Sequence, residues 1–123
     1  MKKILVVDDS RTIRAAIRRI LEPLGFEVDE AENGEMALHY CQEWGGVDAI
    51  LLDIDMPVMD GLTFLGELRR NVHLAQPPVI MCTTHSSFDK ISQALELGAD
   101  EYIMKPFSAE IVSGKLTGIG IAV

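Results

Sequence analysis

Three short apolar runs that each lead into charged residues constrain the fold of this chain most. The runs cover residues 4–7, 49–52 and 102–104, and they lead into Asp8-Asp9, Asp53 and Lys105. If the runs are neighbouring parallel strands, their carboxyl ends meet at the edge where open α/β sheets bind ligands. Carboxylates held close together raise one another's pKa unless a cation joins them. The pattern therefore predicts a metal site at this edge.

Length and charge exclude several classes of protein. The chain has 123 residues, the size of one domain, so we expect a single domain over residues 1–123. Its net charge of −8 argues against direct binding of nucleic acid, which requires surface cations. The first apolar run stops at Asp8, too early for a signal peptide, and no stretch reaches membrane-spanning length. Cys41 and Cys82 lack metal-ligand spacing and fit small core residues in a reducing cytoplasm.

Apolar stretches of strand length alternate with stretches of helical period, which is the pattern of a parallel sheet built from βαβ units. The predicted strands span residues 3–7, 27–31, 48–52, 79–82 and about 100–104. Helices are expected after each strand, capped by Ser10, Asn33 and Asp60 in the first three cases and covering about 87–97 in the fourth. Acidic and apolar residues alternate over 27–31, which indicates an edge strand.

The second predicted helix has apolar residues at helical spacing, which indicates one face packed on the core. These residues are Met36, Ala37, Tyr40, Cys41 and Trp44. His39 and His73 show no spacing to other ligands, so we interpret both as solvated.

A single aspartate after a strand is usually a turn residue or a helix cap. Taken alone, Thr83 and Thr84 likewise fit ordinary strand-exit residues, and Tyr102 fits a core aromatic with its hydroxyl at the surface. Acids at several strand ends, together with a lysine, favour one shared site instead.

Several motifs resemble the receiver domain of bacterial two-component response regulators. They are Asp8-Asp9, residues 51–53 leading into Met56-Pro57, Asp60-Gly61, Thr83, Gly98-Ala99 and Lys105-Pro106-Phe107. The resemblance covers essentially the whole chain, in order and with the family's spacing. It implies an α/β, flavodoxin-like, doubly wound fold with a five-stranded parallel sheet in the order 2-1-3-4-5 and five helices.

The resemblance also implies a phosphoryl-transfer chemistry. Asp53 would accept a phosphoryl group from a phosphohistidine of a histidine kinase or histidine phosphotransfer protein, giving an aspartyl phosphate. Mg²⁺ or Mn²⁺ would bind Asp9, Asp53 and the backbone carbonyl of Asp55, with Asp8 holding a metal-bound water. Since no external substrate is turned over, the protein would be a switch and not an enzyme.

Further residues take roles by the same resemblance. The Thr83 hydroxyl, the Thr84 N–H and the Lys105 ammonium would bind phosphoryl oxygens. Thr83 would move toward the phosphoryl group and Tyr102 would follow, remodelling the face of the fourth helix, fifth strand and fifth helix. Lys105-Pro106 resembles the family's cis peptide.

We expect a stand-alone, monomeric, cytoplasmic receiver that acts by contact with a downstream protein in chemotaxis, stress response or a phosphorelay. Asp55 stands where the chemotaxis member has asparagine, and His85 stands where a stand-alone subgroup has an acid. Both are expected to flank the path of the water that hydrolyses the phosphoryl group and so to tune its lifetime. His85→Ala is expected to slow dephosphorylation.

Two other classes of protein share features with this sequence. Asp53-Ile54-Asp55 resembles the nucleophile motif of haloacid-dehalogenase-like phosphatases, but that family carries the motif on its first strand. A flavin-binding electron carrier of the same sheet order would need a phosphate loop after the first strand, where this chain has Asp8-Asp9.

Overall fold

The computed structural model describes residues 2–84 and 88–123. Five strands alternate with five α-helices: β1 (Lys3–Val7), α1 (Arg11–Leu21), β2 (Glu27–Ala31), α2 (Gly34–Trp44), β3 (Ala49–Asp53), α3 (Gly61–Arg70), β4 (Val79–Thr83), α4 (Phe88–Leu97), β5 (Glu101–Met104) and α5 (Ala109–Gly118). All strand pairs are parallel, and the sheet order is β2-β1-β3-β4-β5. The predicted doubly wound fold is confirmed, and β2 is an edge strand as expected.

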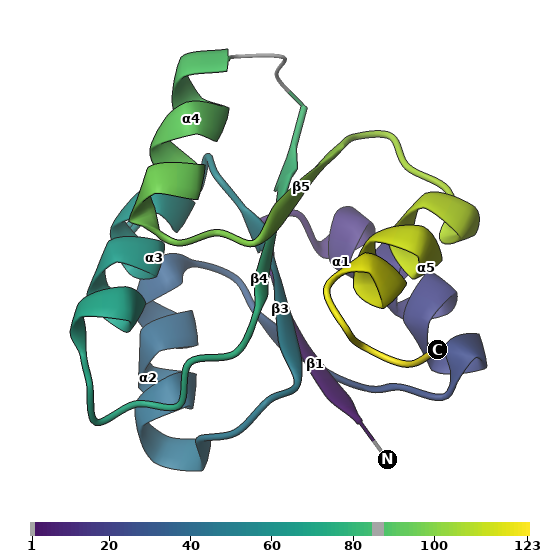
Figure 1. Ribbon diagram of the computed structural model, residues 1–123, viewed down its shortest axis with the longest axis horizontal. Coiled ribbons are helices and arrows are strands. Elements are labelled where there is room, and N and C mark those ends of the chain that lie inside the picture. Colours follow the sequence, from purple (N-terminus) through teal and green to yellow (C-terminus); the bar gives the residue numbers. More distant parts are fainter. Residues whose placement is uncertain (1, 85–87) are drawn as a thin grey trace.

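Helices cover both faces of the sheet (Figure 1): α1 and α5 lie on one face, and α2, α3 and α4 lie on the other. Two apolar cores result, one on each side. The residues of β3 and β4 are buried throughout, because both of their faces are covered. Cys41 and Cys82 are free and buried, as expected of small core residues.

Local side-chain hydrogen bonds explain where helices begin. Ser10 accepts the N–H of Ile13, and Asn33 accepts the N–H of Met36. The carboxylate of Asp60 accepts the N–H of Thr63 at 2.8 Å, so its predicted role as a cap is confirmed. None of the helices that the structure describes is both long enough and apolar enough to cross a membrane.

A glycine holds the loop after β3 against the end of that strand. A Cβ on Gly61 would lie 2.0 Å from the backbone oxygen of Asp53, so a side chain there has no room. The Gly61 N–H donates to the carbonyl of Ile54 at 2.8 Å. The segment between β3 and α3 therefore folds back tightly over the carboxyl end of β3.

The buried face predicted for α2 is wrong at both ends of the helix. Ala37 and Cys41 are buried, but Met36 is 46% exposed and Trp44 is 77% exposed. The reason is the position of β2 at the edge of the sheet, since within residues 2–84 and 88–123 no further strand lies beyond it. Tyr40 is partly buried, and its hydroxyl donates to Asp29 of β2 at 2.5 Å.

Candidate functional site

The carboxyl ends of β1 and β3 bring three carboxylates together. Val7 lies opposite Leu52 in the sheet register, so the residues that come next, Asp8 and Asp53, are neighbours. One oxygen each from Asp8, Asp9 and Asp53 lies within 4.8 Å of the others. Asp8 and Asp53 are buried, at 2% and 8% exposure, while Asp9 is exposed to solvent. The acidic cluster predicted from the strand ends is therefore assembled in the fold.

Lys105 reaches this cluster from the end of β5. Its backbone N–H donates to the carbonyl of Thr83 at 2.7 Å, and the Lys105-Pro106 peptide bond is cis. Its Nζ lies 2.6 Å from Asp8 Oδ2 and 3.3 Å from Asp53 Oδ1. Burial opposes the charged form of Lys105, but hydrogen bonding to Asp8 and the charges of both acids outweigh burial and raise its pKa.

The carboxyl group of Asp53 is hard to ionise in this setting. Burial, and then the neighbouring charge of Asp8, raise its pKa to about 6, although Lys105 and the N–H of Ile54 oppose that rise. The Ile54 N–H donates to Asp53 Oδ1 at 2.9 Å. One ammonium group thus faces three carboxylates, and negative charge is left in excess.

The donor set of this cluster suits a hard divalent cation. Asp8, Asp9 and Asp53 offer only carboxylate oxygens, which are the ligands that Mg²⁺ and Mn²⁺ prefer. A bound cation would offset the excess negative charge and favour the ionised form of Asp53. The residues present therefore fit the metal that the sequence predicts.

The two predicted threonines lie at the carboxyl end of β4, on the same edge of the sheet: Thr83 is the last residue of the strand, and Thr84 follows it. Asp53 pairs with Cys82 in the register, which places Thr83 next in line beside the acids. Thr83 is buried, at 2% exposure, whereas Thr84 is exposed. Tyr102 lies on β5 and is 37% exposed, and the ammonium group of Lys115 is 5.5 Å from its ring centroid.

The structure adds one residue that the sequence did not indicate. Lys90 Nζ of α4 lies 2.9 Å from Asp55 Oδ1, so an ion pair joins α4 to the segment after β3. The pair is 35 residues apart in sequence, and no local spacing could have indicated it. His85, the second residue expected to tune the phosphoryl lifetime, lies outside the described residues, and its role remains a prediction.

Comparison with known proteins identifies the family. Residues 4–116 match the family model of the response regulator receiver domain. The chain is 36% identical over 118 residues to the chemotaxis protein CheY of Pseudomonas aeruginosa, covering 95% of this chain and 94% of that protein. It is 40% identical over 111 residues to the sensor histidine kinase CheAY of Helicobacter pylori, covering 89% of this chain but only 14% of the kinase.

A solved structure agrees with this match. The response regulator protein TrrA of Thermotoga maritima, in complex with Mg²⁺ and BeF, superposes with a TM-score of 0.84 at 36% identity, covering 97% of this chain and 99% of that one. Neither a haloacid-dehalogenase-like phosphatase nor a flavin carrier is supported. The chain belongs to the response regulator receiver domain family, the phosphoryl-accepting switches of two-component signalling.

Proposed function

We propose that Asp53 is the phosphoacceptor of this receiver and that its phosphorylation depends on Mg²⁺ or Mn²⁺. The observation that carries the proposal is the placement of a buried carboxylate, Asp53, beside two further acids and the ammonium group of Lys105. The resemblance to a structure bound to Mg²⁺ and BeF supports the same assignment.

The contacts of Asp53 indicate which of its oxygens reacts. Within the described part of the chain, its hydrogen bond from Ile54 and its ion pair with Lys105 both use Oδ1. Oδ2 is then the oxygen that attacks the phosphorus of a phosphohistidine, the P–N bond breaks, and the imidazole leaves. Asp9, Asp53 and the carbonyl of Asp55 would hold the metal ion, with Asp8 holding one of its waters, and the ion would supply charge neutralisation. The protein itself mainly positions groups that are already in place.

The other predicted residues take supporting roles in this proposal. Lys105 holds the transferred group by charge, and the Thr83 hydroxyl and the Thr84 N–H donate to its remaining oxygens. Phosphorylation and dephosphorylation are catalysed by the chain's own residues, without turnover of an external substrate. Asp55, paired with Lys90, and His85 tune the lifetime of the aspartyl phosphate.

The partners follow from the same proposal. A histidine kinase or histidine phosphotransfer protein donates the phosphoryl group, and a downstream protein reads the altered face of α4, β5 and α5. The similarity to CheY and to a segment of CheAY supports a chemotaxis-like role in the cytoplasm. Cys41 and Cys82, both free and buried, suit that reducing compartment.

Asp9→Ala is expected to weaken Mg²⁺ binding by about tenfold or more, because a carboxylate ligand is lost from the cluster. Isothermal titration calorimetry with MgCl₂ measures the affinity directly. Glu43→Ala is the matched control, since Glu43 is an exposed acid at the opposite end of α2 from the site. An unchanged Mg²⁺ affinity in Asp9→Ala would remove Asp9 from the site.

Beryllofluoride with Mg²⁺ is expected to shift the amide NMR signals of Thr83, Tyr102 and α4 more than those of α1 and α2. A new negative group at Asp53 offers the Thr83 hydroxyl a hydrogen-bond acceptor that exists only in that state, which biases the neighbouring elements. Two-dimensional ¹H–¹⁵N spectra with and without the mimic report the shifts. Changes confined to residues 53–61 would leave Tyr102 as a surface aromatic without a switching role.

A further inference from the structure

We propose that the groove between β2 and α2 binds a short segment of a partner protein that combines apolar side chains with arginine or lysine. The groove, named the α2 groove here, has a volume of about 510 Å³ and is lined by Glu30, Ala31, Met36, Tyr40 and Trp44 among others. Its end at Ala31 adjoins the acidic cluster, because the Asp8 N–H donates to the Ala31 carbonyl at 3.1 Å, but none of its lining residues is an acid of that cluster. The proposal therefore goes beyond the phosphoryl chemistry proposed above.

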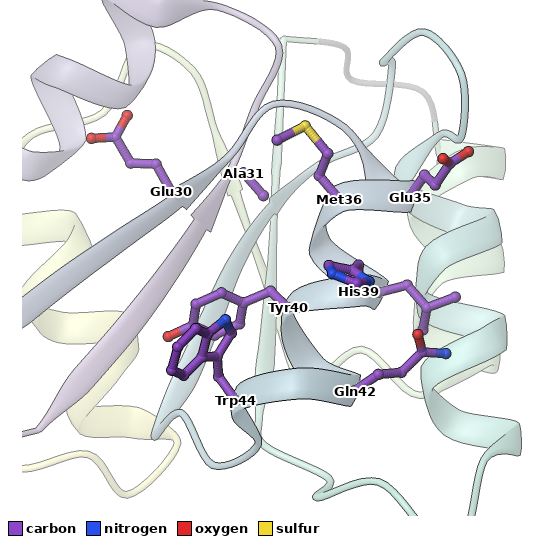
Figure 2. Close-up of a pocket in the computed structure, with 9 residues that line it drawn as sticks. Glu30, Ala31, Glu35, Met36, His39, Tyr40, Gln42 and Trp44 are labelled. Carbon is purple, nitrogen blue, oxygen red and sulfur yellow. The ribbon is translucent and has the colours of Figure 1, made fainter.

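The α2 groove exposes an apolar surface that the fold does not use. Met36, Tyr40 and Trp44 are spaced four residues apart, so they share one side of α2. Figure 2 shows the rings of Tyr40 and Trp44 close together in view, with Met36 on the same side of the helix and Glu30 across from it on β2. Trp44 is the single tryptophan of the chain and is 77% exposed. Large aromatic side chains left exposed beside a hollow are typical of protein interaction sites.

Two of the side chains that line the α2 groove, Tyr40 and Glu30, are held in place before any partner binds. The Tyr40 hydroxyl donates to Asp29 at 2.5 Å, which fixes the tyrosine ring against β2. Glu30 is paired with Arg14 at 2.9 Å and with Arg18 at 2.8 Å. Because the side chains of Tyr40 and Glu30 are already ordered, these two residues lose little conformational entropy when a partner binds.

The charges around the α2 groove favour a basic occupant. Glu35 lies on its lining, and a second hollow of about 200 Å³ shares Glu30, Ala31 and Met36 with it and adds Glu32. Arg14 also lines that second hollow, but it is already paired with Glu30. No ion pair within the described part of the chain involves Glu32 or Glu35, so their charges are left for a partner. Guanidinium and ammonium groups also stack favourably on indole and phenol rings.

The same charges disfavour a second copy of this chain as the occupant. Two copies would bring like charges together, since each chain carries a net charge of −8. Addition of a strand to the edge of β2 is also hindered, because Arg18 Nη2 already donates to the carbonyl of Val28 at 3.1 Å. Insertion of side chains into the α2 groove is therefore the mode of binding that fits.

The test is an NMR titration of the unphosphorylated, ¹⁵N-labelled protein with the peptide acetyl-Leu-Arg-Leu-Arg-amide. We expect saturable shifts at the Trp44 indole N–H and at amides of residues 30–44, with a dissociation constant on the order of 1 mM. The acidic peptide acetyl-Leu-Glu-Leu-Glu-amide is expected to cause none. The result is separable from the phosphoryl proposal, because Asp53 plays no part in it and Asp53→Asn should bind the peptide equally well.

Two variants and one control test the assignment to the α2 groove. Trp44→Ala is expected to weaken peptide binding at least about fivefold, and Glu35→Gln about twofold. Phe88→Ala removes a comparably exposed aromatic, at 79% exposure on α4, and is expected to leave binding unchanged. Four outcomes would each overturn the proposal. The first two are equal binding of the acidic peptide and shifts confined to Asp8, Asp9 and Asp53. The others are self-association of the free protein through residues 30–44 and a titration that does not saturate at roughly 5 mM peptide.

Discussion

Asp53→Asn is expected to reduce labelling of the protein by acetyl phosphate and Mg²⁺ by at least about 100-fold. An amide oxygen is a far weaker nucleophile and metal ligand than a carboxylate, and the two neighbouring acids are placed differently from Asp53. Asp8 is paired with Lys105 at 2.6 Å, and Asp9 is exposed. Intact-mass spectrometry of the protein, with and without acid treatment, measures the fraction that carries the phosphoryl group.

Asp89→Asn is the matched control for this substitution. Asp89 is an exposed aspartate in the first turn of α4, so its variant removes one carboxylate without touching the cluster. It should label like the parent protein. Undiminished labelling of Asp53→Asn, an acid-stable label on a serine, or a label mapped to a histidine would exclude Asp53 as the phosphoacceptor.

The sheet and the acidic cluster were predictable because both depend on local patterns. Strand-length apolar runs alternate with helical periods, and a parallel arrangement alone places the residues after the strands at one edge. Asp8 and Asp53 meet for this reason, and Lys105 reaches them from the end of β5. The helix caps at Ser10, Asn33 and Asp60 could be predicted as well, because each depends on one side chain that accepts an N–H three residues later in the chain.

The features that the sequence did not indicate depend on which surfaces the tertiary fold leaves open. Helical spacing predicted Trp44 on a buried face, but β2 ends the sheet and nothing described lies beyond it to cover that residue. The ion pair of Lys90 with Asp55 joins segments 35 residues apart and depends on how α4 packs beside α3, near the segment that follows β3. Helical periodicity reports which residues of a helix can be buried together, but it does not report whether a neighbouring element covers them, even where the edge of the sheet is itself predicted.

In metal-free buffer at pH 7, Asp53→Asn is expected to raise the free energy of unfolding by about 2 kcal/mol. The pKa of Asp53 is raised from 3.8 to about 6 in the folded protein, first by burial and then by the charge of Asp8. Between these two values the folded state holds more protons than the unfolded state, so its stability falls as pH rises and stays low above pH 6. Asparagine carries no charge at any of these pH values, so the variant does not lose stability as the pH rises through this interval. Lys105 keeps Asp8 as its partner in the variant.

Urea unfolding of the parent protein and of Asp53→Asn, each in EDTA between pH 3.5 and 7.5, measures the effect. The difference in unfolding free energy should be near zero below about pH 4, grow through the interval between the two pKa values, and level off above about pH 6. Titrating groups that do not interact with Asp53 cancel in this difference, because both proteins contain them. Adding Mg²⁺ should reduce this difference in unfolding free energy at pH 7, since the ion binds and stabilises the parent protein more strongly than the Asp53→Asn variant. A parent protein more stable than the variant at pH 7 without metal would mean that the ion pair with Lys105, at 3.3 Å, outweighs the burial of the Asp53 charge.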